Sequence, residues 1–297
     1  MVAQLDDIVG FPVGLQVEAA GTIRGVYSLL QQGTLNLEQV LGLTIVRKTT
    51  VNFTRELLYA GEQVPCVLKG FTRNKGPKQY EEYDDIRKTI DMLVENAPDN
   101  KMVIVGYSLG GLHARAYAQQ YPEHVALCFM VATPQKGTPT AIIGRLLIFA
   151  NAYGQSVEQM MPNNPWIREL NRQYQRHRAI FEEHGTRFVN FRAEHDELVP
   201  QPYSELPHVD AEYRFGGLGH LSAIHSARLY HHLVKEIRDN SDKLYPILLL
   251  HGFGVDEHIF KRLRRQLEQH HPDIAERVHA ISYDYTKPVL FNGASQR

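Results

Sequence analysis

The feature that most constrains the fold is a regular alternation of short apolar runs with helical segments, beginning near residue 79. The runs Lys101–Val105 and Val125–Val131 are typical of strands buried on both faces of a sheet. Arg187–Arg192 and Glu212–Phe215 follow further along the chain as two more strands of this kind. Strands that alternate with helices of about ten or more residues form parallel sheets. We therefore expect an α/β fold, with a mostly parallel central sheet and helices on both faces.

The segments around these runs carry the spacing of amphipathic helices, and the alternation resumes after a short polar linker at 239–243. The predicted helices are Glu81–Asn96, Gly111–Gln120, Ser222–Arg238 and His258–Gln269, and two further strands are predicted at Tyr245–Leu250 and Val278–Tyr283. One domain is therefore expected to span residues 78–297.

Two stretches do not follow the alternation. Residues 1–77 carry no motif, and we treat them as an N-terminal segment of unknown role. Residues 138–183 leave the sheet after the second strand and contain the only tryptophan, Trp166. A long excursion from the carboxyl end of a strand predicts a helical lid, and the alternative is a plain helical insertion with no role in binding.

Composition excludes several classes of protein. The 32 basic and 33 acidic residues leave a net charge of −1, which argues against a nucleic-acid partner. No apolar run reaches the roughly 18 residues of a membrane span. Asp6 and Asp7 stand where a secretory signal carries basic residues, and this favours a cytoplasmic location. Cys66 and Cys128 have no metal-ligand spacing, so we predict no metal site.

The strongest chemical signal is the segment Gly106-Tyr107-Ser108-Leu109-Gly110, which stands directly between a predicted strand and a predicted helix. This G-x-S-x-G pattern is that of a nucleophile elbow, in which a serine occupies a tight strand-to-helix turn. Small residues at Gly106 and Gly110 let neighbouring backbone approach that turn. We therefore predict Ser108 as a nucleophile, and the alternative is a glycine-rich turn whose serine only caps the helix.

A serine nucleophile needs a base, and the base needs an acid that orients it. Asp196 is the acid we favour, because its loop follows the strand Arg187–Arg192; Glu194 and Glu197 are rivals on the same loop. His220, which follows a glycine-rich turn after the next strand, is favoured as the base. We place its rival His225 on the surface of the closing helix.

Besides a nucleophile, a base and an acid, this chemistry needs an oxyanion hole with two backbone N–H donors. The residue after the nucleophile, Leu109, supplies one. The segment His251-Gly252-Phe253-Gly254 follows the apolar strand Tyr245–Leu250, and its Phe253 N–H is our candidate for the second.

Taken together, these segments resemble the α/β-hydrolase lipases and esterases, in particular bacterial triacylglycerol-lipase-like proteins. Residues 132–139, Ala-Thr-Pro-Gln-Lys-Gly-Thr-Pro, are also similar to a segment of that family, with Ala132 and Gln135 at positions usually held by glycine and histidine. The resemblance covers residues 79–297. It implies a triad of Ser108, Asp196 and His220 with oxyanion donors at Leu109 and Phe253.

One departure from the family is large. The oxyanion strand, its helix and the next strand precede the elbow in the family, whereas here they come last, at residues 244–297. The order predicts a circular permutation, with residues 1–77 entering near the mouth of the site, where they could cover it. In the alternative, Gly42–Phe71 supplies degenerate copies of those strands, and 244–297 begins a truncated second unit.

The chemistry that these residues imply is hydrolysis of a carboxylic ester, and of a lipid-type ester in particular, through an acyl-enzyme. It requires no metal or organic cofactor, and the expected partner is a small-molecule or lipid ester. A thioesterase or acyltransferase would use the same groups. A catalytically silent binding scaffold of the same fold is the alternative from a different class.

Overall fold

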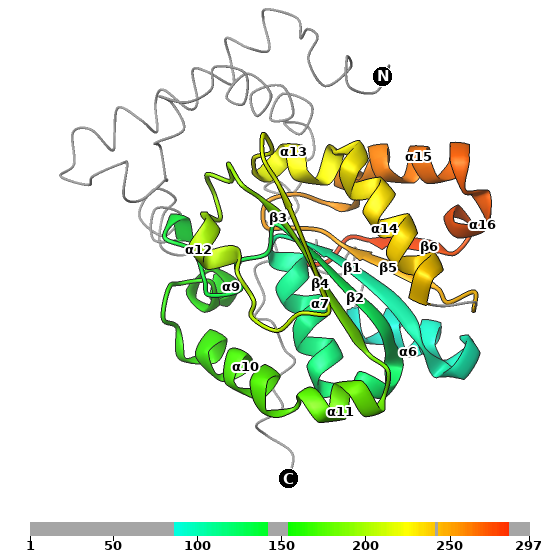
Figure 1. Ribbon diagram of the computed structural model, residues 1–297, viewed down its shortest axis with the longest axis horizontal. Helices are drawn as coiled ribbons and strands as arrows, with labels where there is room; N and C mark the ends of the chain where they lie inside the picture. Colours follow the sequence, from blue (N-terminus) through cyan, green and yellow to red (C-terminus); the bar gives the residue numbers. More distant parts are fainter. Residues whose placement is uncertain (1–85, 142–153, 241–242, 285–297) are drawn as a thin grey trace, which may run out of the picture.

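The computed structural model describes residues 86–141, 154–240 and 243–284 of the chain (Figure 1). Residues 1–77, whose role is the least constrained by the sequence, lie outside the described residues. No helix in the described ranges is long and apolar enough to cross a membrane.

A parallel sheet of six strands forms the centre of the described part of the chain. Its strands are β1 (Met102–Tyr107), β2 (Val125–Val131), β3 (Arg187–Ala193), β4 (Ala211–Phe215), β5 (Ile247–Leu250) and β6 (Val278–Ile281). They lie in the order β4-β3-β2-β1-β5-β6. The late strand β5 therefore pairs directly with β1, with Gly106 in register with Leu250.

Helices cover both faces of this sheet. The longer ones are α6 (Ile86–Glu95), α7 (Leu109–Gln120), α10 (Pro165–Arg176), α14 (Ala227–Asn240) and α15 (Lys261–His270). The shorter ones are α9 (Gly154–Gln159), α11 (Arg178–Glu183), α12 (Gln201–Ser204), α13 (His220–His225) and α16 (Pro272–Ala275), with 3₁₀ turns at η2 (Pro98–Asn100), η3 (Pro122–His124) and η4 (Glu257–Phe260). In Figure 1, α6, α7, α10 and α11 lie on one side of the strands, and α13, α14 and α15 lie on the other.

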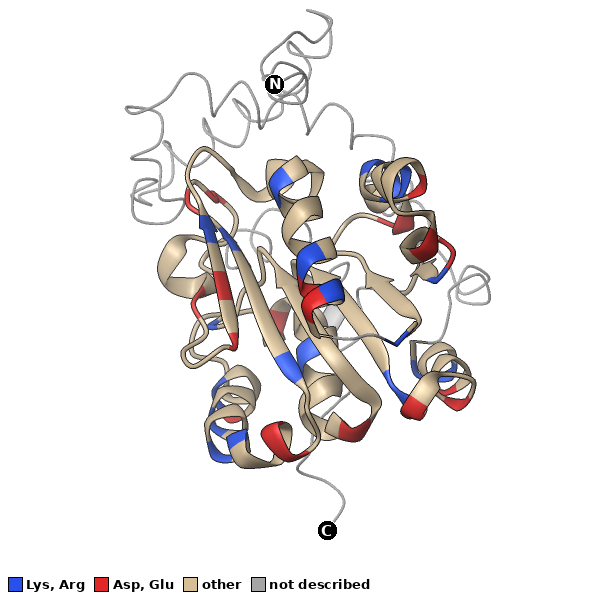
Figure 2. Cartoon of the chain, turned by 45° about the vertical axis from the view of Figure 1, so that its right-hand side comes forward, with Lys and Arg blue, Asp and Glu red and all other residues tan. Residues whose placement is uncertain are grey.

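The alternation of side chains along each strand produces two hydrophobic cores. Ile104 of β1 packs into the core under α6, α7, α10 and α11, whereas its neighbour Val105 packs into the core under α13, α14 and α15. Strands β1, β2, β5 and β6 carry no Lys, Arg, Asp or Glu, whereas β3, β4 and the surrounding helices do (Figure 2). Burial on both faces is what the near-continuous apolar runs in these strands predict.

The predicted closing helix Ser222–Arg238 is divided in the structure. Helix α13 ends at His225, and α14 begins at Ala227. Ser226 between them is extended, with φ −73° and ψ 133°, and its hydroxyl accepts a hydrogen bond from the Arg228 N–H at 3.1 Å. Serine favours this capping role, so the break follows from a residue that the apolar periodicity does not register.

The predicted lid, residues 138–183, is described in part. Its second half packs on the sheet, because Ile167 and Leu170 of α10 and Phe181 of α11 lie in the same core as Phe188 of β3. Helices α10 and α11 therefore serve as the crossover between β2 and β3. Residues 142–153 lie outside the described residues, and the role of the segment as a lid stays a prediction.

Candidate active site

Ser108 occupies a strained turn between β1 and α7. Its φ of 54° and ψ of −121° lie in a region that L-residues other than glycine rarely adopt. The neighbouring glycines are required by close packing: a Cβ on Gly106 would lie 2.3 Å from the carbonyl oxygen of Gly110, and one on Gly110 would lie 2.1 Å from that of Leu250. The turn places Ser108 at the N-terminus of α7, where free backbone N–H groups favour negative charge.

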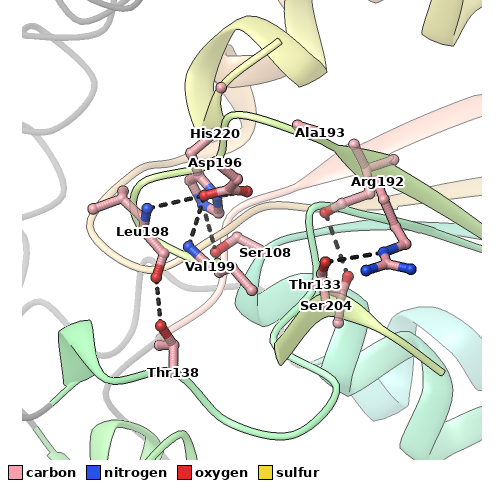
Figure 3. A network of polar contacts seen from close by, with 12 residues as sticks. Ser108, Thr133, Thr138, Arg192, Ala193, Asp196, Leu198, Val199, Ser204 and His220 are labelled. Atoms are coloured by element: carbon pink, nitrogen blue, oxygen red, sulfur yellow. Dashed lines mark hydrogen bonds and ion pairs between the residues drawn. The ribbon is translucent and has the colours of Figure 1, made fainter. Parts of the chain in front are cut away.

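In the three residues that the sequence predicts as a triad, His220 lies within hydrogen-bond distance of both Ser108 and Asp196 (Figure 3). Nε2 of His220 is 3.0 Å from Oγ of Ser108, and Nδ1 of His220 is 2.8 Å from Oδ2 of Asp196. All three side chains are buried, with Ser108 9% exposed and Asp196 3% exposed. The arrangement orders a hydroxyl, an imidazole and a carboxylate so that a proton can pass from the first to the second.

The carboxylate of Asp196 is fixed by its own loop. Its Oδ1 accepts hydrogen bonds from the backbone N–H groups of Leu198 at 2.9 Å and Val199 at 2.6 Å. The carbonyl oxygen of Leu198 in turn accepts hydrogen bonds from the hydroxyls of Thr138 and Thr140. One carboxylate oxygen is therefore occupied by the backbone, and the other is left for the histidine.

The loop that carries Asp196, residues 194–200, is called the acid loop. A buried arginine anchors its end. Arg192 of β3 is 3% exposed and forms an ion pair with Glu212 at 2.8 Å. It also donates hydrogen bonds to the Ser204 hydroxyl at 3.1 Å and to the Gln201 carbonyl at 2.6 Å. These bonds tie α12, which closes the loop, to the strand that opens it.

His220 is held by Tyr107, the residue that precedes Ser108. The ring of Tyr107 lies 5.1 Å from that of His220, centroid to centroid, and its hydroxyl donates a hydrogen bond to the His220 carbonyl at 3.3 Å. The glycine-rich turn before α13 is closed by the hydroxyl of Ser222, which accepts from the Gly219 N–H at 2.8 Å. Tyr107 was not singled out from the sequence, because the elbow pattern leaves that position unspecified.

The rival residues on the same loops lie elsewhere. Glu194 is exposed, and a Cβ on Gly216 would lie 3.1 Å from its Oε2. Glu197 is half-buried. The prediction of a surface position for His225 is wrong: it is 3% exposed, and burial together with the nearby Arg262 lowers its pKa to about 3. Packing between α13 and α15 is a tertiary contact that helical periodicity does not reveal.

The two predicted oxyanion donors belong to two segments that both meet Ser108, the start of α7 and the loop after β5. Leu109 is the first residue of α7 and is fully buried. In the loop after β5, a Cβ on Gly252 would lie 2.9 Å from Cβ of Ser108. Phe253 follows this glycine and packs, half-buried, against the core under α7. The structure thus brings the end of β5 against the elbow.

A buried basic residue that no sequence motif marks lies on α7, the helix that follows the elbow. Arg115 of α7 is fully buried and donates hydrogen bonds to the side chains of Gln135 and Asn171. Burial lowers the pKa of Arg115 to about 10. The arginine links the loop after β2 to helix α10, and an isolated arginine in a helix gives no sequence signal for such a role.

Comparison with known proteins identifies the fold. Residues 68–155 match a family described as the alpha/beta hydrolase fold, and this range includes β1, the elbow, α7 and β2. No curated protein matches the chain in a sequence search. The parallel sheet with helices on both faces agrees with that match, so the chain has the α/β-hydrolase fold, which indicates a hydrolase in general and suits a small-molecule substrate.

Proposed function

We propose that the protein is a serine hydrolase that cleaves carboxylic esters through an acyl-enzyme intermediate. The observation that carries the proposal is the continuous hydrogen-bonded chain from Ser108 through His220 to Asp196. A strained serine at a helix N-terminus, bonded to a buried imidazole, has the geometry of an activated nucleophile.

In the proposed reaction, Oγ of Ser108 attacks the ester carbonyl carbon while its proton moves to Nε2 of His220. The tetrahedral intermediate collapses, the C–O bond to the alcohol breaks, and His220 returns the proton to the departing alkoxide. A water molecule, deprotonated by His220, then attacks the carbonyl carbon of the acyl-enzyme. The bond from that carbon to Oγ of Ser108 breaks, His220 returns the proton to Oγ, and the carboxylic acid is released. The backbone N–H groups of Leu109 and Phe253 are the proposed donors to the oxyanion in both steps.

Asp196 has a defined part in this scheme. Because its Oδ2 accepts from Nδ1 of His220, the neutral imidazole carries its hydrogen on Nδ1 and leaves Nε2 free to take the serine proton. The two backbone bonds to Oδ1 hold the carboxylate in the position that this requires. None of these steps requires a metal or an organic cofactor.

A lipid-type ester is the proposed substrate class. Leu198, on the acid loop, is 45% exposed, so an apolar side chain stands at the surface of the loop that holds Asp196. The apolar segment that begins at Thr138 is joined to the same loop, because the Thr138 hydroxyl donates a hydrogen bond to the Leu198 carbonyl. This contact supports the proposed role of the segment as a lid for an acyl chain.

We also propose that the chain is a circularly permuted hydrolase. The proposal is supported by the pairing of β5 between β1 and β6 and by the approach of Gly252 to Ser108. A permuted chain requires both contacts of the late segment, residues 244–297, because the oxyanion strand of the family lies beside the strand of the elbow.

Hydrolysis of p-nitrophenyl butyrate by the wild type and by Ser108→Ala tests the proposed function. We expect measurable turnover by the wild type and a loss of several orders of magnitude in the variant. A folded wild-type protein with no activity toward short and long acyl esters would leave the binding scaffold as the better explanation. Equal activity of the two proteins would show that Ser108 is not the nucleophile.

A further inference from the structure

The loop that supplies the proposed second oxyanion donor is held by a tyrosine from the other end of the late segment. Tyr283 follows the last strand, β6, and is 2% exposed. Its ring stacks on that of His251, the first residue of the loop, with centroids 4.2 Å apart and planes inclined by 18°. The Tyr283 hydroxyl donates a hydrogen bond to the His251 carbonyl. Its backbone N–H lies 3.2 Å from Nε2 of His251.

These bonds determine which nitrogen of His251 carries the hydrogen. Since Nε2 accepts the backbone N–H of Tyr283, Nε2 has no hydrogen in the neutral ring, and Nδ1 has one. Nδ1 lies 2.8 Å from the carbonyl oxygen of Gly252 and therefore donates to it. Burial raises the pKa of Tyr283, so its hydroxyl keeps its proton and remains a donor.

The carbonyl of Gly252 belongs to the same peptide group as the N–H of Phe253. A trans peptide is planar, so its C=O and N–H point in opposite directions. A hydrogen bond that fixes the Gly252 carbonyl on the His251 side therefore also fixes the direction of the Phe253 N–H. That N–H is the proposed oxyanion donor, and Gly252 lies against Ser108.

We infer that Tyr283 and His251 are positioning residues that orient the Phe253 N–H for the oxyanion. Tyr283 holds His251 through its hydroxyl and its backbone N–H, and His251 holds the peptide that carries the donor. The Tyr283 ring also makes a T-shaped contact with His113 of α7, with centroids 4.9 Å apart, so the tyrosine contacts two imidazoles. The inference rests on the proposed function, since it concerns the oxyanion of that reaction.

The test uses Tyr283→Phe in the full-length protein, with Tyr174→Phe as the matched control. Tyr174 is likewise buried, and its hydroxyl donates to a backbone carbonyl, that of His208 at 3.1 Å, in the core under α10. The Tyr174 hydroxyl also accepts a hydrogen bond from Arg178 at 2.9 Å, so a merely structural cost of losing a hydroxyl affects both variants. We expect Tyr283→Phe to lower kcat roughly 10- to 100-fold, the size of effect produced by a misplacement near 1 Å, and to change KM by less than about twofold.

A second pair of variants tests the hydrogen bond that Nδ1 of His251 donates to the Gly252 carbonyl. His251→Leu removes Nδ1, whereas His251→Asn retains an N–H donor near the same position. We expect His251→Leu to lower kcat as Tyr283→Phe does and His251→Asn to recover most of that loss. Equal loss in both would contradict the role of the Nδ1 hydrogen.

Backbone hydrogen exchange separates this inference from the proposed function. Peptides covering residues 251–254 should exchange faster in Tyr283→Phe than in the wild type and be unchanged in Tyr174→Phe. If the wild type has no esterase activity and residues 251–254 still exchange faster in Tyr283→Phe, the proposed function is wrong. In that case Tyr283 still positions the loop. An active wild type, with kcat and exchange of Tyr283→Phe equal to those of Tyr174→Phe, would overturn the positioning alone.

Discussion

Gly252 lies directly against Ser108, although the two residues come from opposite ends of the described chain. A Cβ on Gly252 would lie 2.9 Å from that of Ser108 and 3.3 Å from the ring of Tyr107. The approach follows from the sheet, in which β5 pairs with β1 and both strands end at the same edge. Functional groups of α/β folds lie at this carboxyl edge, so the late segment reaches the site through strand pairing.

Replacing Asp196 by Asn tests whether this carboxylate sets the tautomer of His220. Oδ1 of the asparagine can still accept the N–H groups of Leu198 and Val199, which turns its NH₂ group toward Nδ1 of His220. That NH₂ group favours the tautomer with hydrogen on Nε2, which cannot accept the serine proton. We expect a folded protein whose kcat is lowered by about 10⁴-fold. If Glu194→Gln or Glu197→Gln produces the loss instead, the acid is a different residue of the loop.

Replacing Gly110 by Ala tests the packing of the elbow on β5. Alanine normally stabilises a helix relative to glycine by about 1 kcal/mol. Here the new methyl group would meet the Leu250 carbonyl, and backbone atoms cannot move aside as a side chain can. Overpacking of this kind costs about 1–3 kcal/mol, so we expect a lower melting temperature.

Gly216→Ala is the control for that experiment, because its methyl group would meet only the flexible end of Glu194. Equal melting temperatures for Gly110→Ala and the wild type would contradict the close approach of α7 to β5.

Removing residues 244–297 tests whether the late segment belongs to this domain. The deletion takes away β5 and β6, and Leu248, Leu249 and Leu250 of β5 are at most 1% exposed. Strand β1 would lose its partner on one side, and both cores would open to solvent. We expect an insoluble or unfolded product. A soluble fragment with a cooperative thermal transition would favour the truncated-tandem alternative, in which the segment lies apart.

Stability should fall in acid partly because of His113. Burial lowers the pKa of His113 to about 3, and neither ring nitrogen has a hydrogen-bond partner among the described residues. Below pH 6.5 the unfolded chain binds a proton at this residue and the native protein does not, so the free energy of unfolding decreases as the pH falls toward 3. At pH 5 the loss is about 2 kcal/mol relative to neutral pH.

We therefore expect His113→Phe, which keeps a ring beside Tyr283, to be less sensitive to acid than the wild type. Denaturant unfolding at pH 5 and pH 8 measures the difference, and His270→Gln at an exposed position is the control. An unchanged pH dependence in His113→Phe would show that His113 is not neutral and buried in the native protein.

The sequence predicts the strands well because apolar runs bounded by turns depend on local pattern. Val125–Val131 has the same bounds in the structure, whereas Tyr245–Leu250 begins two residues later, at Ile247. The three residues predicted as a triad were selected by their positions after strands, and the structure brings them within hydrogen-bond distance. Strand ends meet at one edge of a parallel sheet, so a residue's position after a strand is enough to predict that it lies at that edge.

The supporting contacts could not be predicted in the same way. The bonds between Tyr283 and His251 depend on the pairing of β6 with β5, and no motif marks the tyrosine. The buried Arg115 and His225 lie on helices whose neighbours are set by tertiary packing. Periodicity indicates which face of a helix is apolar, and it does not indicate which polar residue that packing will enclose.

Mapping the covalent adduct of a fluorophosphonate probe tests whether Ser108 is the nucleophile, because such a probe reacts with an activated serine. We predict one adduct, on the peptide that carries Ser108, and a much slower reaction in His220→Ala. No adduct is expected in Ser108→Ala. Labelling of a different serine, or equal labelling of Ser108→Ala and the wild type, would show that Ser108 is not the nucleophile.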